Sequence, residues 1–253
     1  MKIFAIIENT FKEASRDRLL ITLLVIGFLL IASAKIVKPL ALGEETKIIK
    51  DLGLSAITLI SILVAILVGG RLIYKEIEKR TIYIMLSKPV HRYQFIVGKY
   101  FGLLLVIFFT MTVLTGGFYL MLYITGIPAT YSLLLAIMMS FFEIAIITAI
   151  ALFFSTIATP ITASLFTFII YFLSNFTRDL KALAQLSKSA VVQILSNFLY
   201  YLLPNLANFN IRAWVVHDII LNPATILLSI IYAIAYSALV LFIAAILFQR
   251  KDF

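Results

Sequence analysis

The sequence predicts an all-α membrane protein with six membrane-spanning helices. Of its 253 residues, 63% are hydrophobic and only 13% are charged, and the mean hydropathy is +1.10. An ordinary soluble domain is about 45–50% apolar and about 25% charged, so a soluble core could not hide this excess. The apolar residues also gather in long uncharged runs, as they do in helices that cross a bilayer. We therefore expect one membrane domain over residues 1–253.

Residues 1–18 place apolar and charged side chains on opposite sides of a helix. Ile3, Ile7, Phe11 and Ala14 share one face, and polar side chains occupy the other. Such a helix directly before an apolar run is typical of one that lies along the membrane surface. We therefore predict an interfacial elbow helix at 1–18 and treat the first apolar run as a retained anchor. A solvated amphipathic helix is the alternative.

Six apolar runs follow the elbow. The segments TGIPAT and ATP divide the longest stretch, because Gly and Pro end helices. A polar loop is expected at 35–51, and an outer segment with short helices at 177–223. Its stretch LKALAQLSKSAVVQILSNFLYYLL reads as one amphipathic helix. The predicted spans are about 19–35, 52–73, 98–124, 131–157, 161–176 and 224–248.

The basic residues indicate an orientation. If both termini are cytoplasmic, the cytoplasmic pieces carry thirteen Lys and Arg, and the opposite pieces carry the remaining eight of the 21. Seven of the thirteen lie between Arg71 and Lys99. Because cytoplasmic loops are enriched in Lys and Arg, we predict a multi-pass membrane protein with both termini in the cytoplasm.

Several kinds of chemistry are not expected in this chain. Cysteine is absent, which excludes disulfides, zinc–thiolate sites and cysteine nucleophiles. Gly98-Lys99 does not complete a phosphate-binding loop, because Tyr93 stands where the motif needs Gly. His91 and His217 fall on opposite sides of the predicted membrane and cannot share a metal. We expect no enzyme activity, cofactor or metal in this chain, and membrane lipid rather than nucleic acid as the partner of its basic residues.

Glu143 is the one charge between Tyr100 and Thr177. A carboxylate in the middle of a span is costly unless it faces protein or a cavity. It is a candidate for a translocation path, and an interhelical hydrogen bond is the alternative.

Residues 75–97 form a charged segment between the second and third spans. Glu76 to Arg80 extend the second span, Thr81 can cap a short helix, and Ile82, Met85 and Leu86 then share one face. Such a braced helix with an apolar stripe suits docking into a groove of another protein. The alternative is that the stripe packs against the membrane surface.

This segment resembles the one that follows the second span in type-2 permeases of ATP-binding-cassette (ABC) exporters. In that family Gly commonly precedes the Thr, whereas Arg80 stands here. LLPNLANFN and the terminal RKDF are similar to the subgroup labelled for multicopper-enzyme maturation. The matching residues are Glu78, Thr81, Leu86, Ser87, Pro89, Arg92, Phe95, Gly98 and Lys99.

The resemblance implies a permease that moves an unidentified substrate, with ATP and Mg²⁺ bound by a separate ATPase present in two copies. A second permease chain, in a homodimer, would line the path, and an extracytoplasmic accessory protein is a further candidate partner. The short helix would be the coupling helix. The residues expected to couple the ATPase are Glu76, Glu78, Thr81, Ile82, Met85, Leu86, Ser87, Pro89 and Arg92.

Two other functions remain open at this point. A secondary transporter could use Glu143 to carry a coupling proton, although the sequence shows neither internal repeats nor several midplane charges. A membrane assembly protein could use the same charged segment to recruit a cytoplasmic protein without transport.

Overall fold

The computed structural model describes residues 2–37, 44–78, 92–186, 189–216 and 222–249, and within them every regular element is a helix. The all-α prediction is therefore confirmed. The elements are α1 (Lys2–Ser15), α2 (Arg18–Val37), α3 (Glu45–Leu72), α4 (Tyr74–Glu78), α6 (Arg92–Thr125), α7 (Tyr131–Ile157), α8 (Pro160–Asn175), α9 (Thr177–Leu186), α10 (Ala190–Leu202), the 3₁₀ turn η2 (Leu206–Asn208), α11 (Arg212–Val216) and α12 (Pro223–Gln249).

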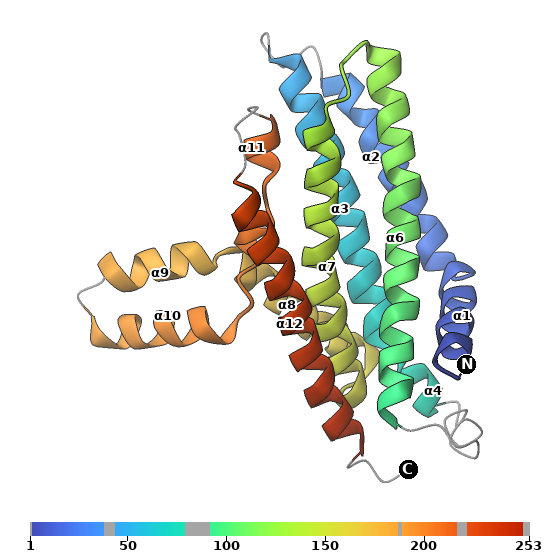
Figure 1. Cartoon of the computed structure of the whole chain (residues 1–253), viewed down its shortest axis with the longest axis vertical. Helices are drawn as coiled ribbons and strands as arrows, with labels where there is room; N and C mark the ends of the chain where they lie inside the picture. Colours follow the sequence, from blue (N-terminus) through green and yellow to red (C-terminus); the bar gives the residue numbers. More distant parts are fainter. Residues whose placement is uncertain (1, 38–43, 79–91, 187–188, 217–221, 250–253) are drawn as a thin grey trace.

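Five of these helices, α2, α3, α6, α7 and α12, are long and apolar enough to cross a membrane. They run roughly along the long axis of the molecule (Figure 1). By length and composition alone, α10 and the η2–α11 segment, which meet at 61°, also pass as one broken span, but α10 lies across the axis of the bundle (Figure 1). The chain is thus a multi-pass membrane protein, as the composition predicts.

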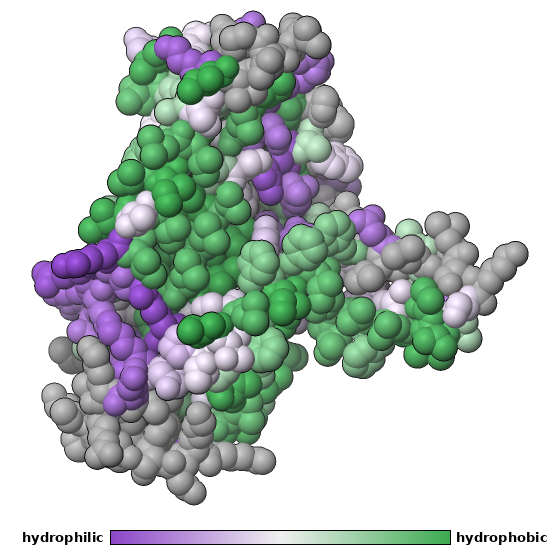
Figure 2. Space-filling view, turned by 180° about the vertical axis from the view of Figure 1, so that it is seen from behind, coloured by the Kyte–Doolittle hydropathy of each residue, from purple (hydrophilic) through white to green (hydrophobic). Residues whose placement is uncertain are grey.

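The long helices differ in how much of them the protein itself covers. In the most apolar window of α3 and of α7, 72% of the residues are buried, against 28% in α2 and in α12. α3 and α7 therefore form the centre of the bundle, and the outer helices turn apolar side chains toward lipid. Apolar residues also dominate the middle of the rear face (Figure 2). We call the two ends of the bundle the α4 end, where α1 and α4 lie, and the α11 end.

The helix breaks lie at the strongest breaking residues. After α6 ends at Thr125, Gly126 has a φ of +71°, a left-handed conformation that favours glycine. Pro160 is the first residue of α8, where its missing N–H costs no helical hydrogen bond. α8 has only 16 residues and is the shortest of the predicted spans.

Two details differ from the sequence predictions. The polar loop expected at 35–51 is wrong for its last seven residues, because α3 begins at Glu45, no breaker follows, and Ile49 is fully buried. The single amphipathic helix expected after Thr177 is in fact a pair, α9 and α10, that lies across the bundle axis (Figure 1). Ser189 has an extended backbone, and its carbonyl begins α10 by accepting the N–H of Gln193 at 3.1 Å.

The N-terminal helix packs against the protein, and its predicted place along the membrane surface stays a prediction. α1 lies along α6, and its most buried residues are Ile6, Thr10 and Ala14. Gly98 and Gly102 lie one turn apart on α6 beneath them. A Cβ added to Gly98 would lie 2.7 Å from Ile6 Cγ2, and one added to Gly102 would lie 2.5 Å from Thr10 Cβ. The two glycines therefore allow α1 to approach α6 closely.

We predict that Gly102→Ala lowers the melting temperature of the purified protein, because the added methyl group pushes α1 away from α6. Gly116→Ala is the matched control on the same helix, since nothing lies within 4 Å of its added Cβ. Removing a glycine from an open helical position should stabilise it by about 0.5–1 kcal/mol. Equal effects of the two substitutions would contradict the close contact.

Candidate functional site

Part of the predicted coupling site lies outside the described residues. This part comprises Thr81, Ile82, Met85, Leu86, Ser87 and Pro89. The structure does show the two ends from which this segment is held, α4 before it and the start of α6 after it. Glu76 is buried and Arg92 half-buried, whereas Glu78 is exposed.

A short break separates α3 from α4 and is held by the neighbouring helix α7. The hydroxyl of Ser155 accepts hydrogen bonds from the backbone N–H groups of Ile73 at 3.1 Å and Tyr74 at 3.4 Å. The Ser155 hydroxyl thus contacts the backbone at the point where α3 passes into α4. The interaction directs α4 toward α1 and α6.

A cluster of four charges joins α1, α4 and α6. Lys99 is fully buried near the start of α6, and its ammonium forms an ion pair with the Glu76 carboxylate. Glu13 of α1 lies 3.9 Å from the same ammonium and 2.8 Å from that of Lys75. We call Glu13, Lys75, Glu76 and Lys99 the charge cluster. Glu76 compensates Lys99 where water is excluded, whereas Glu13 and Lys75 are partly exposed at the edge of the cluster.

A second ion pair ties the turn after α1 to α3. Arg71 donates a hydrogen bond to the carboxylate of Asp17. Burial alone would raise the pKa of Asp17, but the backbone N–H of Leu19 and the guanidinium of Arg71 outweigh it and hold the pKa below its usual value. The carboxylate therefore stays ionised at neutral pH, and α1 is linked to α3 as well as to α6.

The far end of the coupling segment is also anchored. Arg92 donates through Nη1 to the carbonyl oxygens of Phe248 at 3.1 Å and Gln249 at 2.8 Å. A cation at these last carbonyls complements the negative end of the α12 dipole. Phe95 stacks on Phe248 with 5.7 Å between ring centroids. The start of α6 is thus fastened to the end of α12.

Glu143 lies in a different part of the bundle, on α7, and is 1% exposed. Its charge interacts with that of Arg212, the first residue of α11. Arg212 also donates to the hydroxyl of Ser55 on α3 at 2.8 Å. One turn along, Thr58 donates to Ser140 at 3.2 Å. The segment between α10 and α12 therefore sends a cation into the polar interior.

A cavity of about 310 Å³ lies beside this polar group, and we call it the Arg212 cavity. It lies among α2, α3, α8 and α11. Its polar wall consists of Ser33, Ser55, Thr58, Tyr171 and Arg212. Arg212, which is half-buried, is the one charged side chain among the described residues that line the cavity.

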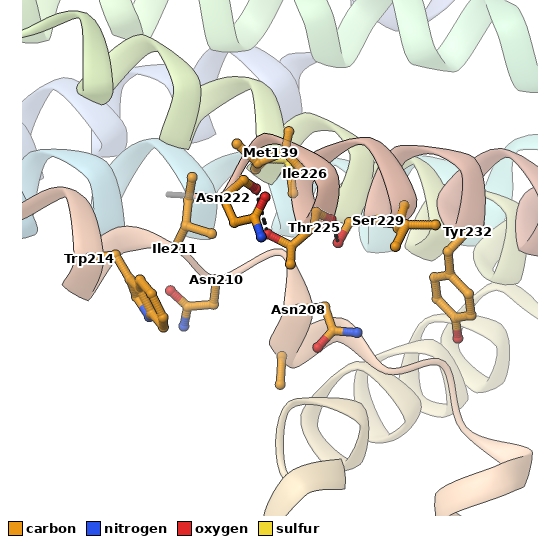
Figure 3. A pocket seen from close by; sticks show the side chains of 12 residues that line it. Met139, Asn208, Asn210, Ile211, Trp214, Asn222, Thr225, Ile226, Ser229 and Tyr232 are labelled. Atoms are coloured by element: carbon orange, nitrogen blue, oxygen red, sulfur yellow. Dashed lines mark hydrogen bonds between the residues drawn. The ribbon is translucent and has the colours of Figure 1, made fainter. Parts of the chain in front are cut away.

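A second hollow, of about 570 Å³, lies at the α11 end between η2–α11 and α12. Carboxamides and hydroxyls line it together with one indole, and Asn210 and Trp214 lie next to each other there (Figure 3). Thr225 donates to the Asn222 carbonyl at 2.7 Å, so part of its polar lining is already paired. In the described residues, no group of three or more His, Cys, Asp or Glu side chains could hold a metal.

The comparisons with known proteins now indicate which kind of membrane protein this is. A family model described as "ABC-2 family transporter protein" matches residues 4–253. The chain belongs to the ABC-2 transporter family. It is therefore a membrane component of an ABC transporter and is not itself the catalytic subunit. The search of curated proteins gave no match.

The family match is coarser than the resemblance seen in the sequence. It supports an ABC-2 permease, and the multicopper-enzyme-maturation subgroup stays a prediction. Sequence reasoning selected Glu76 and Arg92 in this permease but missed Glu13, Lys75 and the role of Lys99. One signal was present, because Lys99 lies inside the predicted span 98–124 and a cation there needs a partner.

We predict that Lys99→Met destabilises this ABC-2 permease by about 3–5 kcal/mol, because it leaves a buried carboxylate without its main partner. Lys99→Met combined with Glu76→Leu should recover most of that loss, since the pair is then replaced by apolar side chains of similar size. The measurement is thermal unfolding in detergent, with Lys12→Met as the control because Lys12 lies in an exposed pair with Glu8. A double variant no more stable than Lys99→Met would contradict the pairing.

Proposed function

We propose that this ABC-2 permease is an exporter subunit that works as a homodimer with two copies of a separate ATPase. ATP and Mg²⁺ would bind to that ATPase, which fits the incomplete phosphate-binding motif at Tyr93 and Gly98-Lys99. The location is the cytoplasmic membrane of a prokaryote. The distribution of Lys and Arg supports placing the α4 end and both termini in the cytoplasm.

The observation that carries this proposal is the charge cluster. The segment between α4 and α6 leaves α4 just after Glu76 and enters α6 at Arg92, seven residues before Lys99. Because Lys99 pairs with Glu76 and lies near Glu13, a displacement of this segment would move α4, α6 and α1 together. The charge cluster thus holds the two ends of this segment rigidly, as a coupling helix requires.

In this proposal the ATPase receives the apolar stripe Ile82, Met85 and Leu86, with Thr81, Ser87 and Pro89 setting the limits of the short helix. Glu78, which is exposed at the end of α4, contributes a charged contact beside this stripe. Glu76 and Arg92 hold the ends of the segment by the contacts described above. When ATP closes the ATPase pair, the resulting movement would be transmitted to α3 and α6 through these two ends.

We expect the double variant Glu78→Lys, Met85→Asp to abolish co-purification with the cognate ATPase. The first substitution reverses the charge beside the apolar stripe, and the second inserts a carboxylate into the stripe. Asp179→Lys, an exposed charge reversal in α9 far from α4, is the matched control and should retain the ATPase. The test is affinity purification in mild detergent with ATPase activity as a second readout. Unchanged co-purification and ATPase stimulation would refute the docking site.

The Arg212 cavity and Glu143 are the proposed part of the translocation path within this chain. Support comes from the half-buried cation Arg212 on the wall of the cavity and from the buried Glu143 carboxylate with which it interacts, because ionisable groups inside membrane helices mark substrate paths. The cavity also lies between α2 and α8, two helices that expose apolar side chains to a second copy in the proposed dimer.

The chain has no cysteine, so single cysteines can report on this path. We predict that Ser33→Cys, on the cavity wall, reacts with a small water-soluble maleimide at different rates in ATP-bound and ADP-bound complexes. Thr110→Cys, fully buried in α6 and absent from the cavity wall, should show no such difference. A rate that responds to an uncoupler but not to nucleotide would instead favour a proton-coupled transporter.

A further inference from the structure

A hollow of about 940 Å³ forms a groove at the surface of the bundle, and none of the described residues that line it belongs to the charge cluster or to the Arg212 cavity. α6 and α12 form its walls and α7 its floor. In Figure 1 α7 is visible between α6 and α12 along this side. We call it the α6–α12 groove. Its volume lies at the upper end of the 300–1,000 Å³ typical of ligand sites.

Small side chains create the groove. Ala145 on the floor and Ala233, Ser237 and Ala238 on α12 leave space where larger residues would fill the interface. Larger apolar side chains such as Phe101 and Phe242 line the same groove and are about half or more exposed. The result is an apolar trough that opens toward the lipid.

At the α4 end the two walls of the groove meet, and the side chains that line the groove there are polar. The Phe95–Phe248 stack and the Arg92 hydrogen bonds join α6 to α12 at that end. Tyr93 and Gln249 line the groove beside this junction. Tyr side chains favour the level of the lipid headgroups. A ligand would therefore place its polar part at Tyr93 and Gln249 and its apolar part along the trough.

The length of the groove matches one lipid chain. From Gln249 to Ala233 the α12 wall extends about 24 Å, and from Tyr93 to Leu104 the α6 wall extends about 17 Å, at 1.5 Å per residue. One leaflet contributes half of a hydrocarbon core of about 30 Å. The trough thus reaches from the headgroup level past the end of one leaflet.

Charge favours an anionic headgroup. Arg92 is half-buried at the start of α6, beside this end of the groove. Basic residues near a membrane surface attract anionic lipid. A membrane helix from another protein would fit the small residues of α12 but would not need polar side chains at one end.

We propose that the α6–α12 groove is a binding site for an anionic phospholipid of the leaflet at the α4 end, with one acyl chain in the trough and the headgroup near Arg92. The bound lipid fills the space between α6 and α12 that their own side chains leave open. This proposal does not depend on the transported substrate or on the ATPase.

The test uses the full-length chain in phosphatidylcholine vesicles that contain phosphatidylglycerol with a photoactivatable diazirine in one acyl chain. After irradiation, peptide mapping should show adducts concentrated on groove residues such as Leu104, Ala145 and Ser237. Ala238→Phe, which fills the trough from an exposed position, should reduce those adducts several-fold. Ala235→Phe is the matched control, since Ala235 is exposed on the same helix but does not line the groove.

Three outcomes would overturn the proposal. Adducts spread evenly over the lipid-facing surfaces of α2 and α12 would show ordinary lipid contact only. Equal groove labelling by the same probe with a phosphatidylcholine headgroup would remove the anionic preference. Disulfide-linked dimers of Ala238→Cys would show that a second copy covers the groove. The mapping on the unsubstituted chain remains informative even if Ala238→Phe fails to fold.

Discussion

A charge that is removed from water must find compensation within the protein, and Lys99 imposes this constraint on the α4 end of the bundle. Its ammonium is fully buried, so Glu76 has to reach it from α4 and Glu13 has to lie near it from α1. Three elements that are distant in the sequence are thereby held at one point. The coupling segment leaves from this point, so its position follows from the same requirement.

Close packing supports this electrostatic constraint. Gly98 and Gly102 remove the side chains that would keep α1 at a distance from α6. Glu13 can approach Lys99 only because α1 lies so close. The glycines and the lysine therefore act together. The glycines allow α1 and α6 to come into contact, and Lys99 requires charged partners at that contact.

The polar groups around Glu143 also bury charge and need compensation, on α7 in another part of the bundle. Arg212 enters from α11, bonds to Ser55 and balances the carboxylate, and the Arg212 cavity remains beside them. The α6–α12 groove is a contrasting case, because most of its lining is apolar, no charged side chain is among the described residues that line it, and small side chains leave its space open. One hollow is suited to a polar path within the protein and the other to a lipid chain at its surface.

The sequence by itself determined the membrane class, the apolar runs and the breaks at Gly126 and Pro160, because hydropathy and backbone preferences act locally. It also singled out Glu76, Arg92 and Glu143 as residues with unusual demands. Only the tertiary structure decided their partners, since Lys99 and Arg212 are reached through packing between distant helices. The same holds for the turned α9–α10 pair, the side of α1 that is buried and the α6–α12 groove. These features depend on which helix surfaces meet, and hydrophobic pattern alone cannot specify that in a chain whose helices are apolar on almost every side.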